Sequence, residues 1–182
     1  MNSSADSYRR FLSGDTDGLS QIVSTYREGL ILYLNTFVRD IYLAEDLTEE
    51  TFVKLILKKP RLKDDAAFKT WLYTIAGNIA RDYLRSKKVK VSSLEDHPYL
   101  QDEMDLERSY IQQQQKILLH RAMEKLKPEY RQVLWLVYFE GFSNREAAHI
   151  LKRTVHSTEV LVSRARGALK RKMLEEGYPY EE

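Results

Sequence analysis

A cluster of basic residues near the end of the sequence is the first feature that indicates a binding function. Between Leu161 and Leu174 the chain has no acidic residue, and its basic residues there are Arg164, Arg166, Lys170, Arg171 and Lys172. Cations gathered in this way bind phosphate groups, and on DNA they displace condensed counterions. The cluster therefore predicts a phosphate-rich partner, and the elements that position it decide which one.

The residues before and through this cluster predict a helix, a tight turn and a second helix. Ser143 and Glu146 form a capping box, in which a serine and a glutamate three residues later satisfy free N–H groups at a helix start. A short helix therefore begins at about Asn144, and Thr154 caps a second helix after a three-residue turn. The second helix has one apolar stripe, which we expect to be buried: Val155, Thr158, Leu161, Val162, Ala165, Leu169 and Met173.

This helix pair has two interpretations. At 1.5 Å per residue, the helix from Val155 to Lys172 is roughly 27 Å long, enough to lie in a major groove with its start on base edges and its basic end on phosphates. Alternatively, the pair is an ordinary helical hairpin whose basic last turn complements the helix dipole. The capping box, short first helix, three-residue turn and basic second helix occur together, which favours DNA.

An acidic segment in the first third of the chain carries the opposite charge. Within eleven residues that include no base, its carboxylates are Asp40, Glu45, Asp46, Glu49 and Glu50. A helix start explains part of this charge, but five carboxylates exceed what capping needs, and Phe52 lies beside them. This mixture suits a docking face for a protein partner. The alternative is a solvated, charged helix face.

A second basic cluster, from Arg85 to Lys90, ends a helix that we expect over residues 66–87. The polar side of this helix shows Lys69, Thr70, Thr74, Asn78, Arg81, Asp82 and Arg85. Aromatic rings next to cations suit single-stranded nucleic acid, because bases stack on the rings while cations follow the phosphates. Trp71 is the nearest ring, but its spacing from Phe68 and Ile75 favours burial.

The composition limits the class of protein. With 182 residues and a net charge of +2, the chain has room for one large or two small domains, and any nucleic-acid preference must come from local clusters. There is no cysteine, and the four histidines form no metal-ligand spacing, so we expect no metal and no cofactor. The longest apolar run, around Leu30 to Leu34, is too short to span a bilayer, and no signal peptide precedes it. We therefore expect a cytoplasmic protein without membrane insertion.

Scarce glycine and proline and recurring helical periodicity predict an all-α fold. Besides the pair above, we expect helices over residues 1–13, 19–37, 43–57, 66–87 and 110–126, and another from residue 128 onward with Val133, Leu134, Val137 and Tyr138 as its apolar stripe. Residues 92–109 are acidic and typical of a linker. We therefore expect two small helical domains, over residues 1–91 and 110–182, joined by this acidic linker.

Three motifs, taken together, resemble a known family. Residues 44–52 read AEDLTEETF, residues 68–78 read FKTWLYTIAGN, and residues 163–166 read SRAR after the helix-turn-helix. In order and spacing they are similar to bacterial RNA polymerase sigma factors of the extracytoplasmic-function (ECF) group of the sigma-70 family. The resemblance covers nearly the whole chain. It implies a factor that binds core RNA polymerase and directs promoter recognition and transcription initiation.

The resemblance also implies roles for individual residues. The N-terminal domain, similar to sigma-70 region 2, would dock on the β′ clamp helices of polymerase through Asp46, Leu47, Glu50 and Phe52. It would contact the −10 element through Pro60, Arg61, Lys63, Lys69, Asn78, Arg81 and Arg85, with Lys69 and Asn78 reading an extruded base. The C-terminal domain, similar to region 4, would read the −35 duplex with Ser143, Arg153, Thr154, His156, Ser157, Glu159, Val160, Arg164, Arg166 and Lys170. The implied partners are core RNA polymerase, including its β subunit, promoter DNA and an anti-sigma factor.

The chain departs from the family pattern at two places. Many members have glycine in the helix-turn-helix turn where this chain has Lys152, so that position either avoids a positive φ or carries strain. Glu159 and Val160 stand where others often have more basic residues, which bears on the identity of the −35 bases.

Two other classes of protein fit parts of the sequence. A two-domain helix-turn-helix transcriptional regulator acting without core polymerase would need a dimer interface or a ligand pocket, and residues 19–87 give no clear sign of either. An enzyme would need carboxylates paired with a histidine or lysine that shares protons, and the sequence has none so arranged. We therefore expect no catalytic residue.

Overall fold

The structure is a computed structural model that describes residues 3–90 and 110–178. Its elements are α1 (Ser4–Leu12), α2 (Thr16–Val38), α3 (Ile41–Lys58), α4 (Asp65–Lys90), α5 (Tyr110–Glu124), α6 (Pro128–Leu134), the π-helix η1 (Trp135–Phe139), α7 (Asn144–Leu151) and α8 (Val155–Glu175). Within these ranges there is no strand, as the sequence predicted, and no helix has the length and apolarity to cross a membrane. The linker predicted over residues 92–109 lies outside the described residues.

Helices α1 and α2 are joined by a shorter turn than the sequence predicted. Asp15 caps α2 by accepting the N–H of Asp17 at 3.0 Å, so the helix already includes Gly18. Gly18 is required by a close approach, because a Cβ there would lie 2.3 Å from the carbonyl oxygen of Ser7 in α1. The predicted break at residues 14–18 was therefore too long, since Gly18 serves packing between the two helices.

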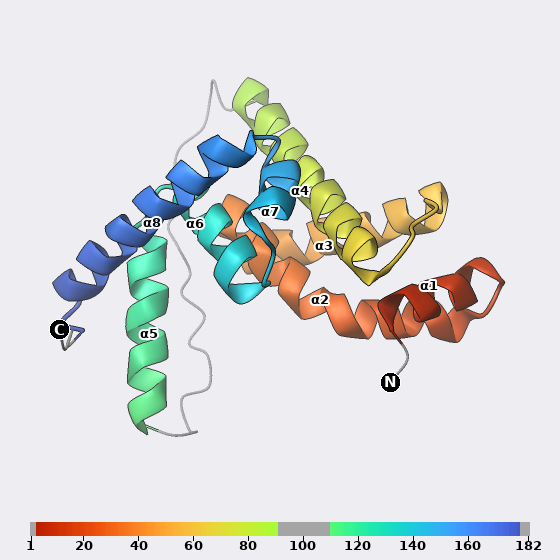
Figure 1. The fold of residues 1–182 in the computed structure, drawn as a ribbon, viewed down its shortest axis with the longest axis horizontal. Coiled ribbons are helices and arrows are strands. Elements are labelled where there is room, and N and C mark those ends of the chain that lie inside the picture. The colour runs from red at the N-terminus through yellow and green to blue at the C-terminus, as the bar shows by residue number, and fades with distance from the viewer. Residues whose placement is uncertain (1–2, 91–109, 179–182) are drawn as a thin grey trace.

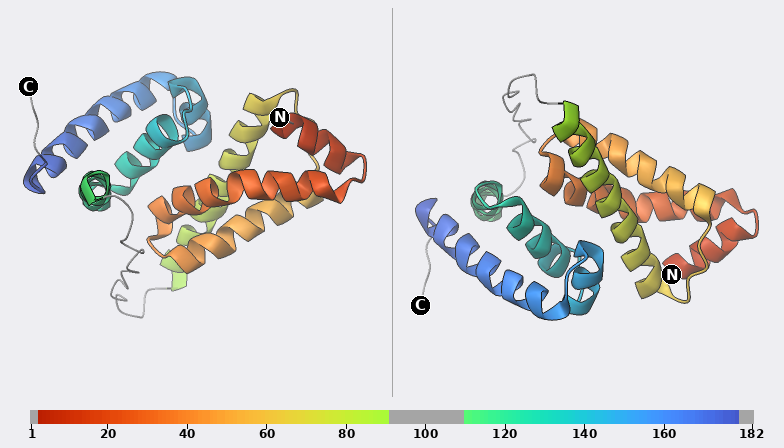
Figure 2. Two further views of the ribbon diagram at one scale, coloured as in Figure 1. Left: turned by 90° about the horizontal axis from the view of Figure 1, so that it is seen from below. Right: turned by 90° about the horizontal axis from the view of Figure 1, so that it is seen from above.

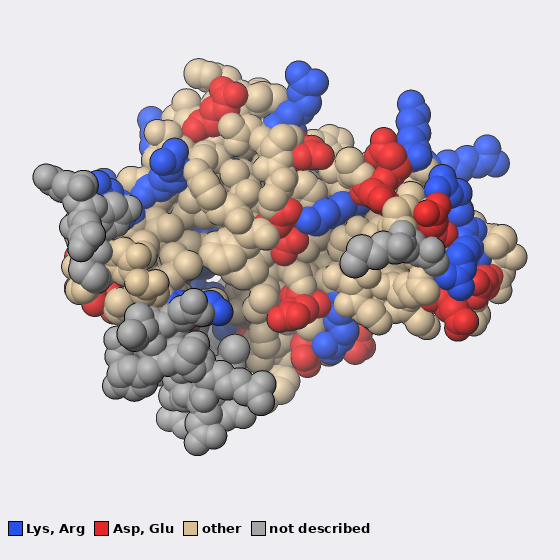
Figure 3. Space-filling model, turned by 60° about the horizontal axis from the view of Figure 1, so that its bottom comes forward, with Lys and Arg blue, Asp and Glu red and all other residues tan. Residues whose placement is uncertain are grey.

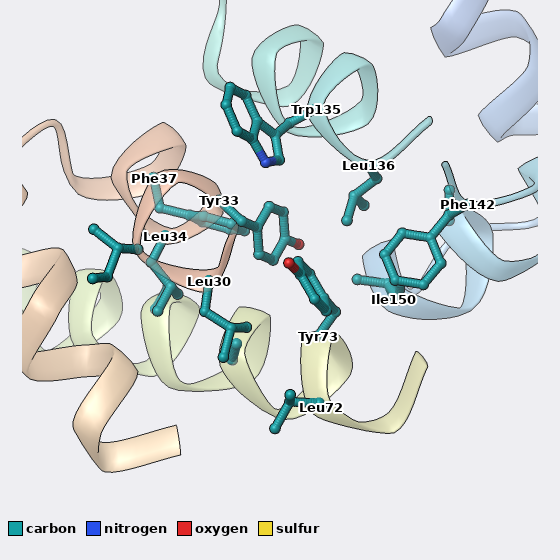
Figure 4. Close-up of a cluster of buried hydrophobic side chains, with 14 of the residues drawn as sticks. Leu30, Tyr33, Leu34, Phe37, Leu72, Tyr73, Trp135, Leu136, Phe142 and Ile150 are labelled. Carbon is teal, nitrogen blue, oxygen red and sulfur yellow. The ribbon is translucent and has the colours of Figure 1, made fainter. Parts of the chain in front are cut away.

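Helix α6, the π-helix η1 and helix α7 pack against α2 and α4, and α8 packs on α6 and α7 with α5 beside it (Figures 1 and 2). One hydrophobic core runs through both groups of helices. Figure 4 shows Tyr33 of α2 and Tyr73 of α4 facing Leu136, Phe142 and Ile150, which follow residue 110. The rings of Tyr73 and Phe142 meet edge to face, with their centroids 5.2 Å apart. The two predicted domains therefore share a core, while their exact boundaries stay a prediction.

The helix that begins at Pro128 changes character after about two turns. From Trp135 to Phe139 it is a π-helix, and the N–H of Glu140 donates to the carbonyl oxygen of Trp135 five residues earlier, at 3.0 Å. A π-turn holds one more residue than an α-turn, so side chains beyond it point in different directions. Val133 and Leu134 are buried as predicted, whereas Tyr138 is 55% exposed. The prediction that Tyr138 is buried was wrong for this reason.

The helix-turn-helix forms as its capping residues predicted. Ser143 and Glu146 make the reciprocal capping box of α7, and Thr154 caps α8 by accepting the N–H of Ser157 at 3.1 Å. The apolar stripe of α8 is buried from Thr158 through Ala165, as predicted. Val155, the first residue of the helix, is instead 41% exposed. Lys152 ends α7 with φ 55° and ψ 46°, so this turn carries the strain of a left-handed residue other than glycine.

Candidate nucleic-acid interface

One side of α8 packs on the core and the other is open to solvent. His156 and Glu159 are exposed at its start, and Ser157 and Val160, each the next residue along, are partly exposed. Further along, Arg164, Arg166 and Lys170 are also exposed. The arrangement has the form of a recognition helix, with potential base-reading residues at the start and cations behind them.

Arg153 and Ser143, both predicted to contact the −35 element, are also engaged inside the protein. A guanidinium nitrogen of Arg153 lies 2.8 Å from Glu129 Oε2, which ties the turn before α8 to α6. The hydroxyl of Ser143 donates to Glu146 Oε2 at 2.8 Å as part of the capping box. Both side chains therefore position the helix pair, whatever else they contact.

The outer face of the acidic helix α3 contains apolar residues as well as the predicted carboxylates. Asp46 and Glu50 are exposed, whereas Leu47 and Phe52 are buried in the core and support the helix from inside. The sequence analysis did not predict three exposed apolar residues on this helix, Tyr42, Val53 and Leu57. Their spacing follows the helical repeat, so they lie on the same side as the carboxylates. We call this exposed set the α3 stripe: Tyr42, Asp46, Glu49, Glu50, Val53 and Leu57.

The connection from α3 to α4 carries the first of the residues predicted to contact the −10 element. Arg61 and Lys63 are exposed, while Pro60 is partly buried and its carbonyl oxygen accepts from Tyr8 Oη at 2.7 Å. Burial raises the pKa of Tyr8 to about 12, so its hydroxyl remains a donor at neutral pH. Basic side chains gather at the right-hand end of Figure 3, where Figure 1 places α1 and this connection.

The remaining predicted −10 residues lie along α4 but do not share one face. Lys69 and Asn78 are nine residues apart, about two and a half helical turns, so their side chains leave α4 on nearly opposite sides. Lys69 and Arg81 instead face the helices that follow residue 110. Lys69 Nζ donates to the carbonyl oxygen of Glu140 at 2.6 Å, and Arg81 Nη2 donates to that of Ile150 at 3.2 Å. Arg81 also donates to Asn78 Oδ1 at 2.9 Å, and its burial lowers the pKa of the guanidinium.

The fold and these surfaces define a class of protein: a helical DNA-binding protein with a helix-turn-helix, a second basic helix and an acidic helix. The sequence matches "Sigma-70 region 2" over residues 22–89 and "Sigma-70, region 4" over residues 116–169, which together make up well over half of the chain. The chain belongs to the sigma-70 family of RNA polymerase sigma factors, in its ECF group.

Individual relatives agree with this family. RNA polymerase sigma-H factor of Pseudomonas aeruginosa is 28% identical over 170 residues, covering 88% of each chain. ECF RNA polymerase sigma factor SigM of Bacillus subtilis is 28% identical over 152 residues, covering 84% of this chain and 93% of SigM. Among solved structures, the sigma factor RpoE of Bartonella quintana, in complex with the anti-sigma factor NepR, has the same fold, with a TM-score of 0.64 at 23% identity over 85% of this chain and 95% of RpoE.

Proposed function

We propose that this sigma factor binds core RNA polymerase, opens the −10 element with the domain over residues 1–91 and reads the −35 duplex with the domain over residues 110–182. The observation that carries the proposal is the order of the two sigma-70 regions along the chain, each with a surface suited to its task. A helix-turn-helix regulator acting alone would leave the region 2 match and the acidic helix unexplained. The proposal needs no catalytic residue, because the sigma-70 family is not a family of enzymes.

The α3 stripe is the surface that we assign to core polymerase. Its carboxylates, Asp46 and Glu50 among them, repel the phosphates of DNA but attract a basic protein surface. Its apolar members supply contact area, and Leu57 is 75% exposed. A stripe of carboxylates and apolar side chains fits the β′ clamp helices, which are the partner that the family resemblance implies. Leu47 and Phe52 support α3 from the core side.

The −10 element is assigned to residues on two sides of α4 and in the connection before it, which we together call the −10 face: Lys69, Asn78, Arg81 and Arg85 of α4 with Pro60, Arg61 and Lys63. Cations and an amide suit an unpaired strand, because cations follow phosphates while an amide can hydrogen-bond an extruded base. The −35 element is assigned to the exposed side of α8, with Glu159 able to accept from a cytosine amino group.

The experiment that tests the proposal reconstitutes transcription. The purified chain should co-elute stoichiometrically with core polymerase and start transcripts at defined sites, whereas a stable dimer that binds a palindrome alone would contradict the proposal. Alanine at both Lys69 and Asn78 should leave closed complexes nearly intact but reduce the permanganate reactivity of −10 thymines. Lys116→Ala, at an exposed position on α5, is the matched control and should leave this reactivity unchanged.

An anti-sigma factor is the remaining partner that we propose. The support is family membership and the fold shared with RpoE, which was solved with NepR. Purification of the tagged protein from its host, followed by identification of associated proteins, tests this partner directly. Recovery of core polymerase alone under non-inducing conditions would count against it.

A further inference from the structure

Helix α7 and the residues just before it lie along a single ridge of α4. Lys69, Tyr73, Gly77 and Arg81 follow one another at intervals of four residues, the spacing that forms a packing ridge on a helix. The aromatic ring of Phe142 lies at one end, with its centroid 4.9 Å from Lys69 Nζ, and the carbonyl oxygen of Ile150 lies at the other end, on Arg81. Both ends of this ridge belong to the −10 face.

Glu140 provides the most specific contact across this interface. Its carboxylate lies 3.4 Å from Lys69 Nζ, and its backbone carbonyl oxygen accepts from the same ammonium group. On the other side, Glu140 Oε1 accepts from Trp135 Nε1 at 3.3 Å. This contact spans five residues, so it depends on the π-turn, which brings residues five apart into register.

Two glycines allow close approaches, Gly29 at the interface and Gly77 beside it. A Cβ on Gly29 of α2 would lie 2.9 Å from Glu140 Oε1 and 2.6 Å from Tyr73 Oη, closer than real contacts allow. Burial, with the neighbouring Glu140 carboxylate, raises the pKa of Tyr73, which keeps its hydroxyl protonated. On α4, a Cβ on Gly77 would lie 3.3 Å from both Tyr33 Oη and a guanidinium nitrogen of Arg81. Glycine in mid-helix is unfavourable by itself, so the close approach is its physical reason.

A buried arginine of the C-terminal domain donates hydrogen bonds to the N-terminal domain. Arg131 of α6 is 5% exposed, and its Nη2 donates to the carbonyl oxygen of Thr36 near the end of α2 at 3.1 Å. Its Nη1 donates to the carbonyl oxygen of Leu126 at 2.6 Å. The guanidinium therefore joins the last turn of α2 to the C-terminal domain, where the helix dipole favours a cation.

We propose that in the free protein the C-terminal domain covers Lys69 and Arg81 of the −10 face, with Glu140 holding Lys69 in place of the promoter strand. This inference rests on the proposed function of that face. A carboxylate and a carbonyl oxygen offer Lys69 the same charge-assisted bonds that a phosphate oxygen would. Because Lys69 and Arg81 cannot serve both partners, single-stranded DNA and the C-terminal domain exclude one another. Opening of this contact is therefore a step that precedes −10 recognition.

The test measures closure and DNA binding on the full-length chain. Since the sequence has no cysteine, Asp17→Cys and Gln115→Cys, both at exposed positions, place one dye on each domain for energy transfer. Glu140→Lys sets a like charge against Lys69, and Gly29→Ala intrudes on the same carboxylate from another helix. The control is Glu176→Lys: Glu176 is paired with Lys125 of its own domain, and its side chain is 13% exposed, as is that of Glu140.

Both interface variants should lower energy transfer, whereas the control should match wild type. The probe for binding is the non-template −10 strand of a promoter that the holoenzyme transcribes. If the open form is about a tenth or less of the free protein, opening should lower the apparent Kd for this strand about tenfold or more. Circular dichroism identical to wild type identifies variants that remain folded.

The outcomes separate this inference from the proposed function. Wild-type energy transfer in both folded interface variants would overturn the inference, and so would opening without tighter binding while Lys69→Ala still impairs strand opening in the holoenzyme. If Lys69→Ala had no effect in the holoenzyme, the proposed function of the −10 face would fail instead, and the inference would fail with it.

Discussion

At Lys152 a favourable charge at a helix end is opposed by an unfavourable backbone conformation. Its φ of 55° lies in the left-handed region, as do those of Arg39 and Lys59, which end α2 and α3. All three are long basic residues at helix ends, where a cation complements the dipole but a Cβ resists the backbone conformation. The charge near the helix end is thus retained together with some strain.

Replacing Lys152 with glycine should therefore stabilise the protein. Relief of the left-handed strain is worth about 1–2 kcal/mol, and the added flexibility of glycine in the unfolded chain offsets roughly 0.5–1 kcal/mol of it. We expect a net gain of up to about 1.5 kcal/mol in the free energy of unfolding, and each kcal/mol raises Tm by about 2–4 °C for a chain of this size. Lys116→Gly in α5 should instead lower Tm, because glycine is unfavourable inside a helix; a lower Tm for Lys152→Gly would contradict the argument.

Base reading and phosphate contact on α8 should have different signatures. Glu159→Ala should change the preferred base at one −35 position at a cost of about 1–3 kcal/mol, because Glu159 is exposed at the start of the helix. Arg166→Ala should weaken all promoters alike and reduce the slope of log K against log salt by about one unit. A promoter library with binding measured at several salt concentrations checks both. Uniform weakening by Glu159→Ala with an altered consensus for Arg166→Ala would reverse our orientation of the helix.

Individual residues were predictable where their role is local. Ser143, Glu146 and Thr154 were assigned correctly, because a helix cap depends on neighbours within four residues. Phe142 precedes the same cap, yet nothing nearby in sequence indicates that its ring meets Tyr73 of α4. Gly29 and Glu140 were missed for the same reason, since their contacts are between residues far apart in the chain.

At the scale of elements, the sequence predicted where the helices lie better than it predicted which side chains each helix exposes. Periodicity located α2, α3, α4 and α8, because each buries a continuous apolar stripe. The π-turn at Trp135–Phe139 could not be predicted, since it depends on how Trp135 and Glu140 pack rather than on local propensity. The docking face of α3 was predicted from its carboxylates with Leu47 and Phe52, which are buried, so the exposed Val53 and Leu57 were missed.

The α3 stripe makes a prediction about polymerase binding. Leu57→Ser should weaken core binding by about 1–2 kcal/mol, roughly tenfold, if Leu57 is an anchor of the interface. Leu12→Ser, at another exposed leucine on α1, is the control and should bind core normally. Competition against wild type for a limiting amount of core polymerase measures the difference. Equal effects of the two substitutions would show that surface apolarity, rather than the α3 stripe, is responsible.

The charged members of the stripe should act differently from Leu57. Reversing charge at Asp46 and Glu50 should weaken core binding, most strongly at low salt, because steering between opposite charges is screened by ions. Helical content measured by circular dichroism should not change, since both side chains are exposed. Wild-type core affinity at low salt would remove the carboxylates from the proposed interface.

At the scale of the whole molecule, the shared core makes the two domains depend on one another. Tyr73, Phe142 and Ile150 are buried by contacts between helices on either side of residues 91–109. The sequence predicted both helical groups but not that they pack together, because a linker pattern specifies chain length and charge rather than docking. Docking depends on complementary surfaces, such as the ridge of α4, that arise only once both groups have folded.

The last prediction follows from this shared core. The free wild-type chain should unfold in one calorimetric transition, because separating the domains exposes side chains that each needs covered. Phe142→Ala removes a ring buried against Tyr73 and Lys69, and truncation of a buried phenylalanine costs about 3–5 kcal/mol. Much of that cost falls on the interface, so the variant should show two transitions. Phe139→Ala removes a 45% exposed ring that stacks on Trp135 within its own domain, so it should keep a single transition. Two transitions in wild type, or one in Phe142→Ala, would mean that the interface does not couple the domains.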